Sequence, residues 1–126
     1  MILVDTSVWI DFLRRGSGAS PLAGVLEAGD AWTHPFVTGE LALGSLGRRR
    51  RRILADLRLL PPLPALADAE VHELVEARGL AGSGIGWVDA HLLGSALAGG
   101  ARLWTLDRRL ARVATSLGAS GSPTAP

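Results

Sequence analysis

The chain has 126 residues, of which 48% are hydrophobic, and a mean hydropathy of +0.27. These values favour one packed domain with a sizeable core and exclude a disordered chain. The chain contains no cysteine, which excludes thiolate metal sites and thiol nucleophiles. The formal net charge is only +1, but all 13 basic residues are arginine, the side chain that binds phosphate in a bidentate manner.

No apolar run approaches the ~20 residues that a membrane helix requires. The N-terminus lacks a basic segment and carries Asp5 within its apolar run, which is not the pattern of a secretory signal. We therefore expect a cytoplasmic protein that does not associate with a membrane.

The short apolar run at residues 2–4 predicts a buried strand of a parallel sheet. A helix is expected directly after it, because apolar residues recur at helical spacing from Val8 to Leu13. Asp5 or Thr6 can cap this helix. At the carboxyl end of the strand, Asp5 would lie where open α/β sheets bind their ligands. Residues 14–18 are expected to form a turn.

The next helix is predicted to begin at Ser20-Pro21 and to end at Gly29. Residues 31–33 are a candidate strand, and a third helix is expected over residues 36–46. Glu40 is predicted to point from that helix towards apolar packing. A carboxylate on a mostly apolar side of a helix is unusual, and it suggests a functional role.

Five consecutive arginines open the following segment, whose apolar residues from Ile53 to Leu60 predict a helix. Two prolines end it, residues 63–65 are a candidate strand, and another helix is expected from Ala67 or Asp68. Residues 79–86 form a glycine-rich loop without the Gly-Lys-Ser/Thr of a Walker loop, and we interpret it as a flexible connection.

The last third of the chain again alternates between helix and strand. A helix is predicted over residues 87–97 with Asp89 in its first turn, and a strand over residues 101–105. Asp107 follows that strand, and apolar spacing from Leu110 to Leu117 predicts a final helix.

Short strands that alternate with helices predict a three-layer α/β/α sandwich on a mostly parallel sheet. Residues 1–117 would form this domain. Residues 118–126 are rich in Gly, Ser and Pro and are expected to form a mobile tail.

Four acids carry the predicted chemistry: Asp5, Glu40, Asp89 and Asp107. Parallel strands end at one edge of the sheet, which brings Asp5 and Asp107 together, and the start of a helix at Asp89 can face the same edge. Uncompensated carboxylates at close range repel one another, and a divalent cation relieves this repulsion. All-oxygen ligands suit Mg²⁺ or Mn²⁺. Such an ion activates water and neutralises charge on a phosphate.

Four segments resemble, in chain order, the acidic motifs of PIN-domain nucleases: Val4-Asp5-Thr6-Ser7, Gly39-Glu40-Leu41-Ala42, Val88-Asp89-Ala90-His91-Leu92 and Trp104-Thr105-Leu106-Asp107. The resemblance covers roughly residues 1–117, and the VapC-type toxin of bacterial toxin–antitoxin pairs is the closest pattern. It implies a PIN-like fold and an endoribonuclease toxin that depends on Mg²⁺ or Mn²⁺ and cuts RNA with metal-activated water. It also implies a cognate VapB-like antitoxin and a homodimer or a toxin–antitoxin hetero-oligomer.

Carried over residue by residue, the resemblance implies metal-binding and catalytic roles for Asp5, Glu40, Asp89 and Asp107. Ser7 and Thr105 would be polar residues that orient carboxylates or waters. After Asp107 the sequence departs from many relatives, because Arg108-Arg109 stand in place of a further acid.

Each acid also has a structural alternative. Asp5 and Asp107 could be plain helix caps, Glu40 could pair with an arginine, and Asp89 could be favourable charge in a first helical turn. Asp11 is interpreted as structural, because Arg14 and Arg15 lie within one turn of it.

The arginine run is interpreted as a solvated helix face, with contact to RNA phosphate or to an antitoxin segment as open alternatives. Its members are Arg48, Arg49, Arg50, Arg51 and Arg52.

Core or dimer packing is expected for Trp9, Trp87 and Trp104. His34 and His72 are expected at the surface, and His91 is expected to point away from Asp89, so that general-base work by its imidazole is not expected.

Two rival functions come from other classes of protein. A phosphoacceptor domain of the receiver type also clusters acids around Mg²⁺, but it relies on a lysine and this chain has none. An inactive PIN-like module that binds RNA or a protein partner stays open, although a repulsive cluster of acids costs stability unless a metal is bound.

Overall fold

The structure is a computed structural model, and it describes residues 1–16 and 20–121. A parallel sheet of three strands in the order β2-β1-β3 lies at its centre. The strands are β1 (Ile2–Val4), β2 (Ala31–Trp32) and β3 (Arg102–Trp104). Leu3 of β1 stands opposite Trp32 on one side and Leu103 on the other. Because β1 is paired on both sides, its apolar run is buried, as the sequence predicts.

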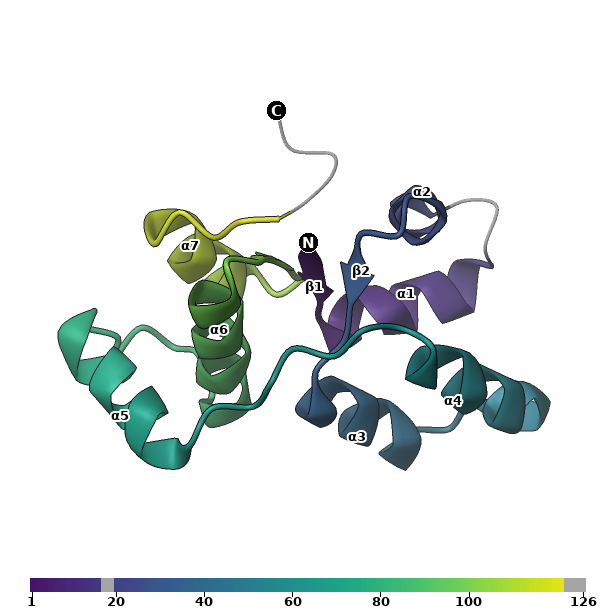
Figure 1. Ribbon diagram of the computed structural model, residues 1–126, viewed down its shortest axis with the longest axis horizontal. Helices are drawn as coiled ribbons and strands as arrows, with labels where there is room; N and C mark the ends of the chain where they lie inside the picture. Colours follow the sequence, from purple (N-terminus) through teal and green to yellow (C-terminus); the bar gives the residue numbers. More distant parts are fainter. Residues whose placement is uncertain (17–19, 122–126) are drawn as a thin grey trace.

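Helices surround the sheet and confirm the predicted α/β fold. Figure 1 shows α5, α6 and α7 on one side of β1 and the earlier helices on the other. The helices are α1 (Thr6–Arg15), α2 (Pro21–Glu27), α3 (Pro35–Leu43), the 3₁₀ turn η2 (Gly47–Arg49), α4 (Arg50–Arg58), α5 (Asp68–Ala77), α6 (Trp87–Gly99) and α7 (Arg108–Ser116). Within residues 1–16 and 20–121, no helix combines the length and the apolar character that a membrane span needs.

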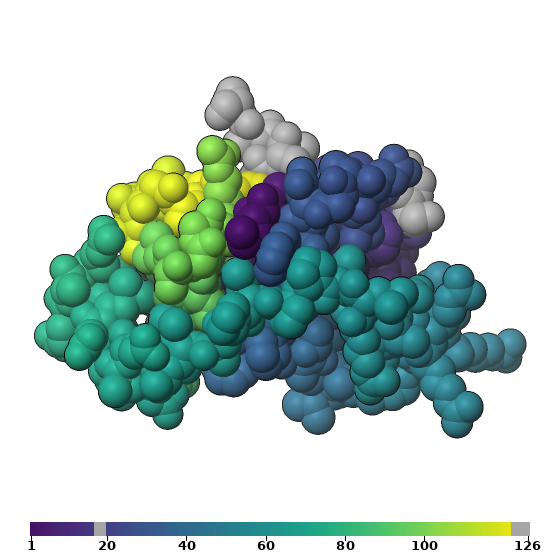
Figure 2. Space-filling model, in the orientation of Figure 1, coloured from purple at the N-terminus to yellow at the C-terminus, as the bar shows by residue number. Residues whose placement is uncertain are grey.

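The core forms where β1 meets α6. Leu3 and Val4 are fully buried, and residues 90–96 of α6 are buried without interruption. In the space-filling view, the N-terminal strand (purple) lies between a blue segment from the first half of the chain and a green segment from the second half (Figure 2). The fold thereby brings the end of β1 close to residues that follow it by a hundred positions.

Several predicted boundaries differ from the structure; for example, the helix predicted over residues 87–97 runs to Gly99, and the strand predicted over residues 101–105 is confined to Arg102–Trp104. The third helix ends at Leu43, before the expected residue 46, because Gly44 leaves the helix and its N–H bonds to Leu41. Residues 63–65 form no strand, and the pairing there is a single parallel bridge between Thr33 and Pro62. Two hydrogen bonds make this bridge, from Thr33 N–H to Pro61 O at 2.9 Å and from Leu63 N–H to Thr33 O at 2.8 Å.

The chain after α7 continues into the packed structure. Leu103 N–H donates to Ala119 O at 2.7 Å, and Gly121 N–H donates to Leu103 O at 3.0 Å. The first residues of the expected tail therefore pair with β3. The division at residue 117 stays a prediction, and residues 122–126 lie outside the described residues.

The expected turn at residues 14–18 is wrong in its first part. Arg14 and Arg15 are the last residues of α1, and Gly16 ends the helix with φ 82°. Residues 17 and 18 lie outside the described residues. Arg15 pairs with Asp11 at 2.9 Å, as expected for residues one turn apart.

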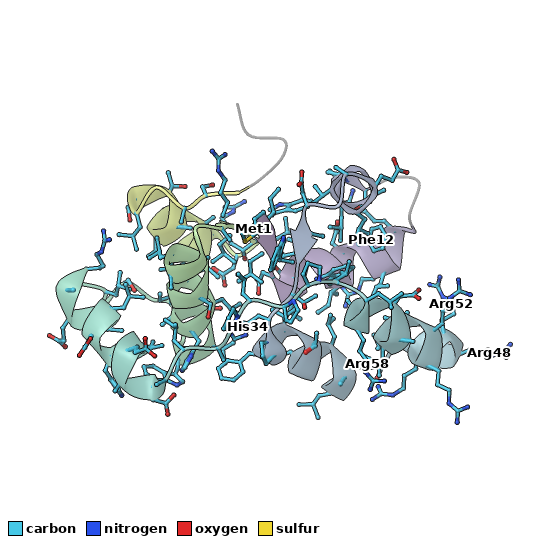
Figure 3. All side chains as sticks on the ribbon, viewed as in Figure 1. Met1, Phe12, His34, Arg48, Arg52 and Arg58 are labelled. Carbon is cyan, nitrogen blue, oxygen red and sulfur yellow. The ribbon has the colours of Figure 1, made fainter. Side chains whose placement is uncertain are left out.

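Trp9 and Trp104 are each 5% exposed, as expected for core residues. Trp87 is 42% exposed and is not a core residue, so for this side chain the alternative of dimer packing stays a prediction. The expectation that His34 lies at the surface is also wrong. His34, labelled in Figure 3, is fully buried. Its Nδ1 accepts from Phe36 N–H at 3.0 Å, and its Nε2 lies 3.1 Å from Ser95 Oγ. Its position directly before Pro35 places it at the start of α3, beneath α6.

Candidate active site

Asp5 lies at the carboxyl end of β1 and occupies the N-cap position of α1. Its side chain makes no cap hydrogen bond with the helix. Oδ2 instead accepts from Ser7 Oγ at 2.8 Å and from Thr105 Oγ1 at 2.7 Å, and the residue is 7% exposed. The interpretation of Asp5 as a plain side-chain cap is therefore wrong. Both hydrogen bonds fall on one oxygen, which leaves Oδ1 for another ligand.

The two hydroxyl groups that hold Asp5 are themselves fixed by the backbone. Ser7 Oγ accepts from Leu106 N–H at 3.0 Å, and Thr105 Oγ1 accepts from Asp107 N–H at 3.0 Å. Each hydroxyl proton is then directed at the carboxylate. The junction between β3 and α7 thus orients Asp5 on β1. The role of Ser7 and Thr105 in a metal site stays a prediction.

Glu40 reaches the same edge of the sheet from α3, which packs against α1. Its Oε1 accepts from Thr6 Oγ1 at 2.8 Å. The expectation that Glu40 points towards apolar packing is wrong, because the residue is exposed. The inward side of α3 is instead carried by Val37 and Leu41. Because Glu40 is exposed, water can solvate its carboxylate and no arginine partner is required. Among the described residues, Glu40 forms no ion pair with an arginine.

Asp89 stands in the first turn of α6, where its Oδ2 accepts from Gly86 N–H at 3.1 Å. Burial raises the pKa of Asp89 above its ordinary value, while the Gly86 hydrogen bond works in the opposite direction. Three further carboxylates add to the rise through their negative charge: Asp5, Asp107 and Glu40. Asp5, Glu40 and Asp107 therefore lie close enough to Asp89 for their charges to act on it.

Asp107 follows β3 and caps α7. Its Oδ1 accepts from Arg109 N–H at 2.9 Å and from Leu110 N–H at 3.2 Å. The capping alternative is thus realised in the structure. It does not exclude a second role, because the same carboxylate contributes to the raised pKa of Asp89.

The chemistry of these side chains fits a hard divalent cation, since carboxylate oxygens are the ligands that Mg²⁺ and Mn²⁺ prefer. Their present spacing does not close around one ion: within the described part of the chain, no three His, Asp or Glu side chains are placed to hold a metal together. The reason is local. Glu40, Asp89 and Asp107 each accept from a nearby hydroxyl or N–H donor, and binding a shared cation requires these side chains to rotate.

Comparison with known proteins identifies the family. The sequence profile of the PIN domain matches residues 2–116, which is most of the chain. The chain belongs to the PIN-domain family.

Relatives of this PIN domain are found among sequences and among solved structures. It is 51% identical over 111 residues to the protein named Ribonuclease VapC32 of Mycobacterium tuberculosis, with 87% of each chain covered. Its fold is similar to that of PAE2754 from Pyrobaculum aerophilum (TM-score 0.60, 20% identity, 89% and 83% of the two chains covered). It is likewise similar to FitAcB from Neisseria gonorrhoeae (TM-score 0.61, 18% identity, 91% and 94% covered).

The arginine run of this PIN domain spans η2 and the start of α4, and Arg48 and Arg52 project outwards (Figure 3). Its members have different surroundings. Arg50 donates to Ala42 O and Gly44 O, so it satisfies carbonyls at the end of α3. Arg52 lies 3.5 Å from Asp56. The prediction that the run binds RNA or an antitoxin stays a prediction.

Two groups in the PIN-domain site were not expected from sequence: the Thr6 hydroxyl on Glu40 and the Gly86 N–H on Asp89. Gly86 could have been found, because an acid three residues after the N-cap position commonly reaches back to that residue's N–H. Thr6 could not, because its partner depends on how α3 packs on α1. His91 is buried and bonds through Nε2 to Asp68 at 3.0 Å, which agrees with the expectation that it points away from Asp89.

Proposed function

We propose that this PIN domain is a metal-dependent endoribonuclease and the toxin of a toxin–antitoxin pair. Mg²⁺ or Mn²⁺ is the proposed ion. The 51% identity to a protein named as a VapC ribonuclease supports the activity. Divalent-metal dependence is a general property of PIN-domain nucleases of this type.

The observation that carries this proposal is that three acids from other elements, Asp5, Glu40 and Asp107, lie close to Asp89 on α6. Its carboxylate is partly buried and faces the charge of three others. Such a group of negative charges destabilises a fold unless a cation neutralises it. A nuclease requires such a cation, because the phosphate of its substrate brings a further negative charge to the cluster of acids.

In this proposal Asp5, Glu40, Asp89 and Asp107 hold the ion, which supplies a water of lowered pKa and neutralises charge on the scissile phosphate. Asp5 is held in one orientation by Ser7 and Thr105. Glu40 is exposed and free to turn from Thr6 towards the ion. Water would be the nucleophile and the 3′-oxygen the leaving group, so that the P–O3′ bond breaks and the expected products carry 5′-phosphate and 3′-hydroxyl ends.

A VapB-like antitoxin is the proposed partner, in line with the VapC name of the relative. A homodimer or a toxin–antitoxin hetero-oligomer is proposed as the assembly, and the cytoplasm as the location.

The test compares one acid of the cluster with an acid outside it. We expect purified protein to cleave single-stranded RNA with Mg²⁺ or Mn²⁺ and to lose this activity in excess EDTA. Asp5→Asn should abolish cleavage and keep the circular dichroism spectrum. Asp11→Asn is the matched control, because Asp11 lies on α1 and pairs with Arg15, and it should keep the activity. Full cleavage by Asp5→Asn, or in EDTA, would refute the proposal.

One observation favours a second candidate function. The carboxylates are engaged by local donors and do not surround an ion as they stand, which is the arrangement expected of an inactive PIN-like module that binds RNA or a partner. Calorimetric titration with Mn²⁺ separates the two. Saturable binding that disappears in Asp5→Asn supports the nuclease, and equal heats for both proteins support the binding module.

A further inference from the structure

A cleft with a volume of about 300 Å³ extends from the acid cluster across α1 and the end of α3. Glu40 lines it together with two cations, Arg14 and Arg49. Its apolar lining includes Ile10 and Leu46. The cleft thus joins a carboxylate of the proposed nuclease site to positive charge and to apolar surface.

Among the described residues, the charges of Arg14 and Arg49 are not engaged in an ion pair, unlike those of Arg15 and Arg52. Arg15 pairs with Asp11, and Arg52 pairs with Asp56. Within the described residues neither Arg14 nor Arg49 has a carboxylate within 4.0 Å, and both are exposed. Of the guanidinium groups on α1 and the arginine run, these two are therefore the ones that line the cleft and remain available to an anion.

We propose that this cleft binds one nucleotide of the RNA next to the scissile bond, and this rests on the proposed function. Arg14 and Arg49 hold its phosphate, while the apolar wall at Ile10 and Leu46 packs against its ribose or base. The volume lies at the lower end of the range of about 300–1,000 Å³ typical of ligand pockets, which suits a single nucleotide.

Electrostatics favours RNA over a protein as the occupant. The acid cluster repels a polyanion, so a substrate that must approach Glu40 needs positive charge close by. The cleft offers two unpaired guanidinium groups against one carboxylate. Guanidinium groups bind phosphate through paired hydrogen bonds, and a phosphodiester chain supplies a phosphate at every nucleotide.

The experiment measures binding of a fluorescent single-stranded RNA by anisotropy in EDTA, where cleavage does not interfere. Arg14→Ala and Arg49→Ala should each weaken binding about ten-fold. The double variant should lower the slope of log K against log salt by about 0.7, since both arginines hold one phosphate and each phosphate contact to a single strand contributes about 0.7. Arg78→Ala is a control of equal charge change outside the cleft, and we expect less than about a two-fold effect.

A second pair of variants tests the cleft without removing an arginine. Ser45 is exposed and lines the cleft. Ser45→Glu places a carboxylate beside both guanidinium groups and should weaken RNA binding, whereas Ser45→Gln, of nearly the same size, should weaken it much less. Thermal unfolding of all variants identifies any general loss of structure. The slope of log K against log salt is the separate readout for a lost phosphate contact.

The outcomes separate this inference from the proposed function. If the unaltered protein cleaves RNA while the arginine variants bind with unchanged affinity and slope, the cleft proposal is overturned and the nuclease proposal stands. If the variants keep RNA binding but lose affinity for a co-expressed partner protein, the cleft is a protein-docking site and the proposal is again overturned. If the unaltered protein neither binds nor cleaves RNA, both proposals fail.

Discussion

The hydroxyl of Thr105 is expected to support both stability and metal binding, because it donates the shorter of the two hydrogen bonds to Asp5, at 2.7 Å. Thr105→Val removes this donor and keeps the shape of the side chain. It also removes the acceptor for the Asp107 N–H. Both Asp5 and Thr105 are at most 9% exposed, so water does not readily replace the lost hydroxyl.

The size of the effect follows from these two contacts. A hydrogen bond to a charged group contributes about 1.5–3 kcal/mol, and one between neutral groups about 0.5–1.5 kcal/mol. We expect Thr105→Val to lower the free energy of unfolding by about 2–4 kcal/mol. With a urea m-value of about 1.5 kcal/mol per molar, the midpoint of unfolding would fall by roughly 2 M.

Urea unfolding followed by circular dichroism measures this change. Thr115→Val is the matched control, because Thr115 Oγ1 donates to the Ala111 carbonyl on the exposed side of α7; its effect should stay within about 0.5 kcal/mol. A double-mutant cycle with Asp5→Asn then isolates the pair, with an expected coupling of about 1–2 kcal/mol. In calorimetry, the affinity for Mn²⁺ should fall about 10- to 100-fold.

The reasoning would be refuted by a Thr105→Val protein with the stability of the unaltered protein and no coupling to Asp5→Asn. It would also be refuted by a stability loss that Thr115→Val reproduces. Loss of stability with unchanged Mn²⁺ affinity would leave the hydroxyl a structural role only and would contradict its proposed role in orienting Asp5.

The shifted pKa values of Asp89 and His34 predict how the stability of the fold depends on pH. An acid with a raised pKa destabilises the fold once the pH exceeds its ordinary pKa. Asp89→Asn should therefore raise the melting temperature at pH 7, and this gain should shrink near pH 4. An equal gain at pH 7 and at pH 4 would contradict this prediction. Burial, with a further contribution from the charge of His91, lowers the pKa of His34 from 6.5 to about 4. The unfolded chain binds this proton first, so the contribution of His34 to stability should fall by about 2 kcal/mol between pH 7 and pH 5. An imidazole titration by NMR with a midpoint for His34 near 6.5 would disprove the burial argument.

The order of elements and the acids at strand ends could be predicted because both follow from local signals. The apolar run before Asp5 and the apolar strand before Asp107 each predict a strand end. Parallel pairing then brings those ends together by a general rule of sheet topology. The hydroxyl partners of Asp5 could be expected only through the family resemblance, because Thr105 lies a hundred residues away.

Errors arose where the surroundings of a residue depend on distant packing. Glu40 has apolar neighbours on its own helix, but α3 buries only Val37 and Leu41, and Leu43 is 91% exposed. Apolar residues on this helix are therefore a poor guide to its inward face. His34 is buried because it meets Ser95, which lies 61 positions further along the chain. Nothing near His34 in the sequence indicates that contact.

Three of the four acids lie at helix N-termini, and this explains why sequence could not separate capping from catalysis. Asp5, Asp89 and Asp107 occupy the start of α1, α6 and α7, where the helix dipole favours negative charge. The dipoles reduce the free-energy cost of gathering carboxylates, so helix capping and the proposed metal site both favour an acid at the same positions.

Variants of Asp107 can separate capping from metal binding, because an oxygen of this side chain caps α7. Asn caps a helix about as well as Asp, whereas Ala costs about 1 kcal/mol. Asp107→Asn should keep the stability seen in urea and lose Mn²⁺ affinity, while Asp107→Ala should lose both. If Asn restored both, capping alone would account for this residue.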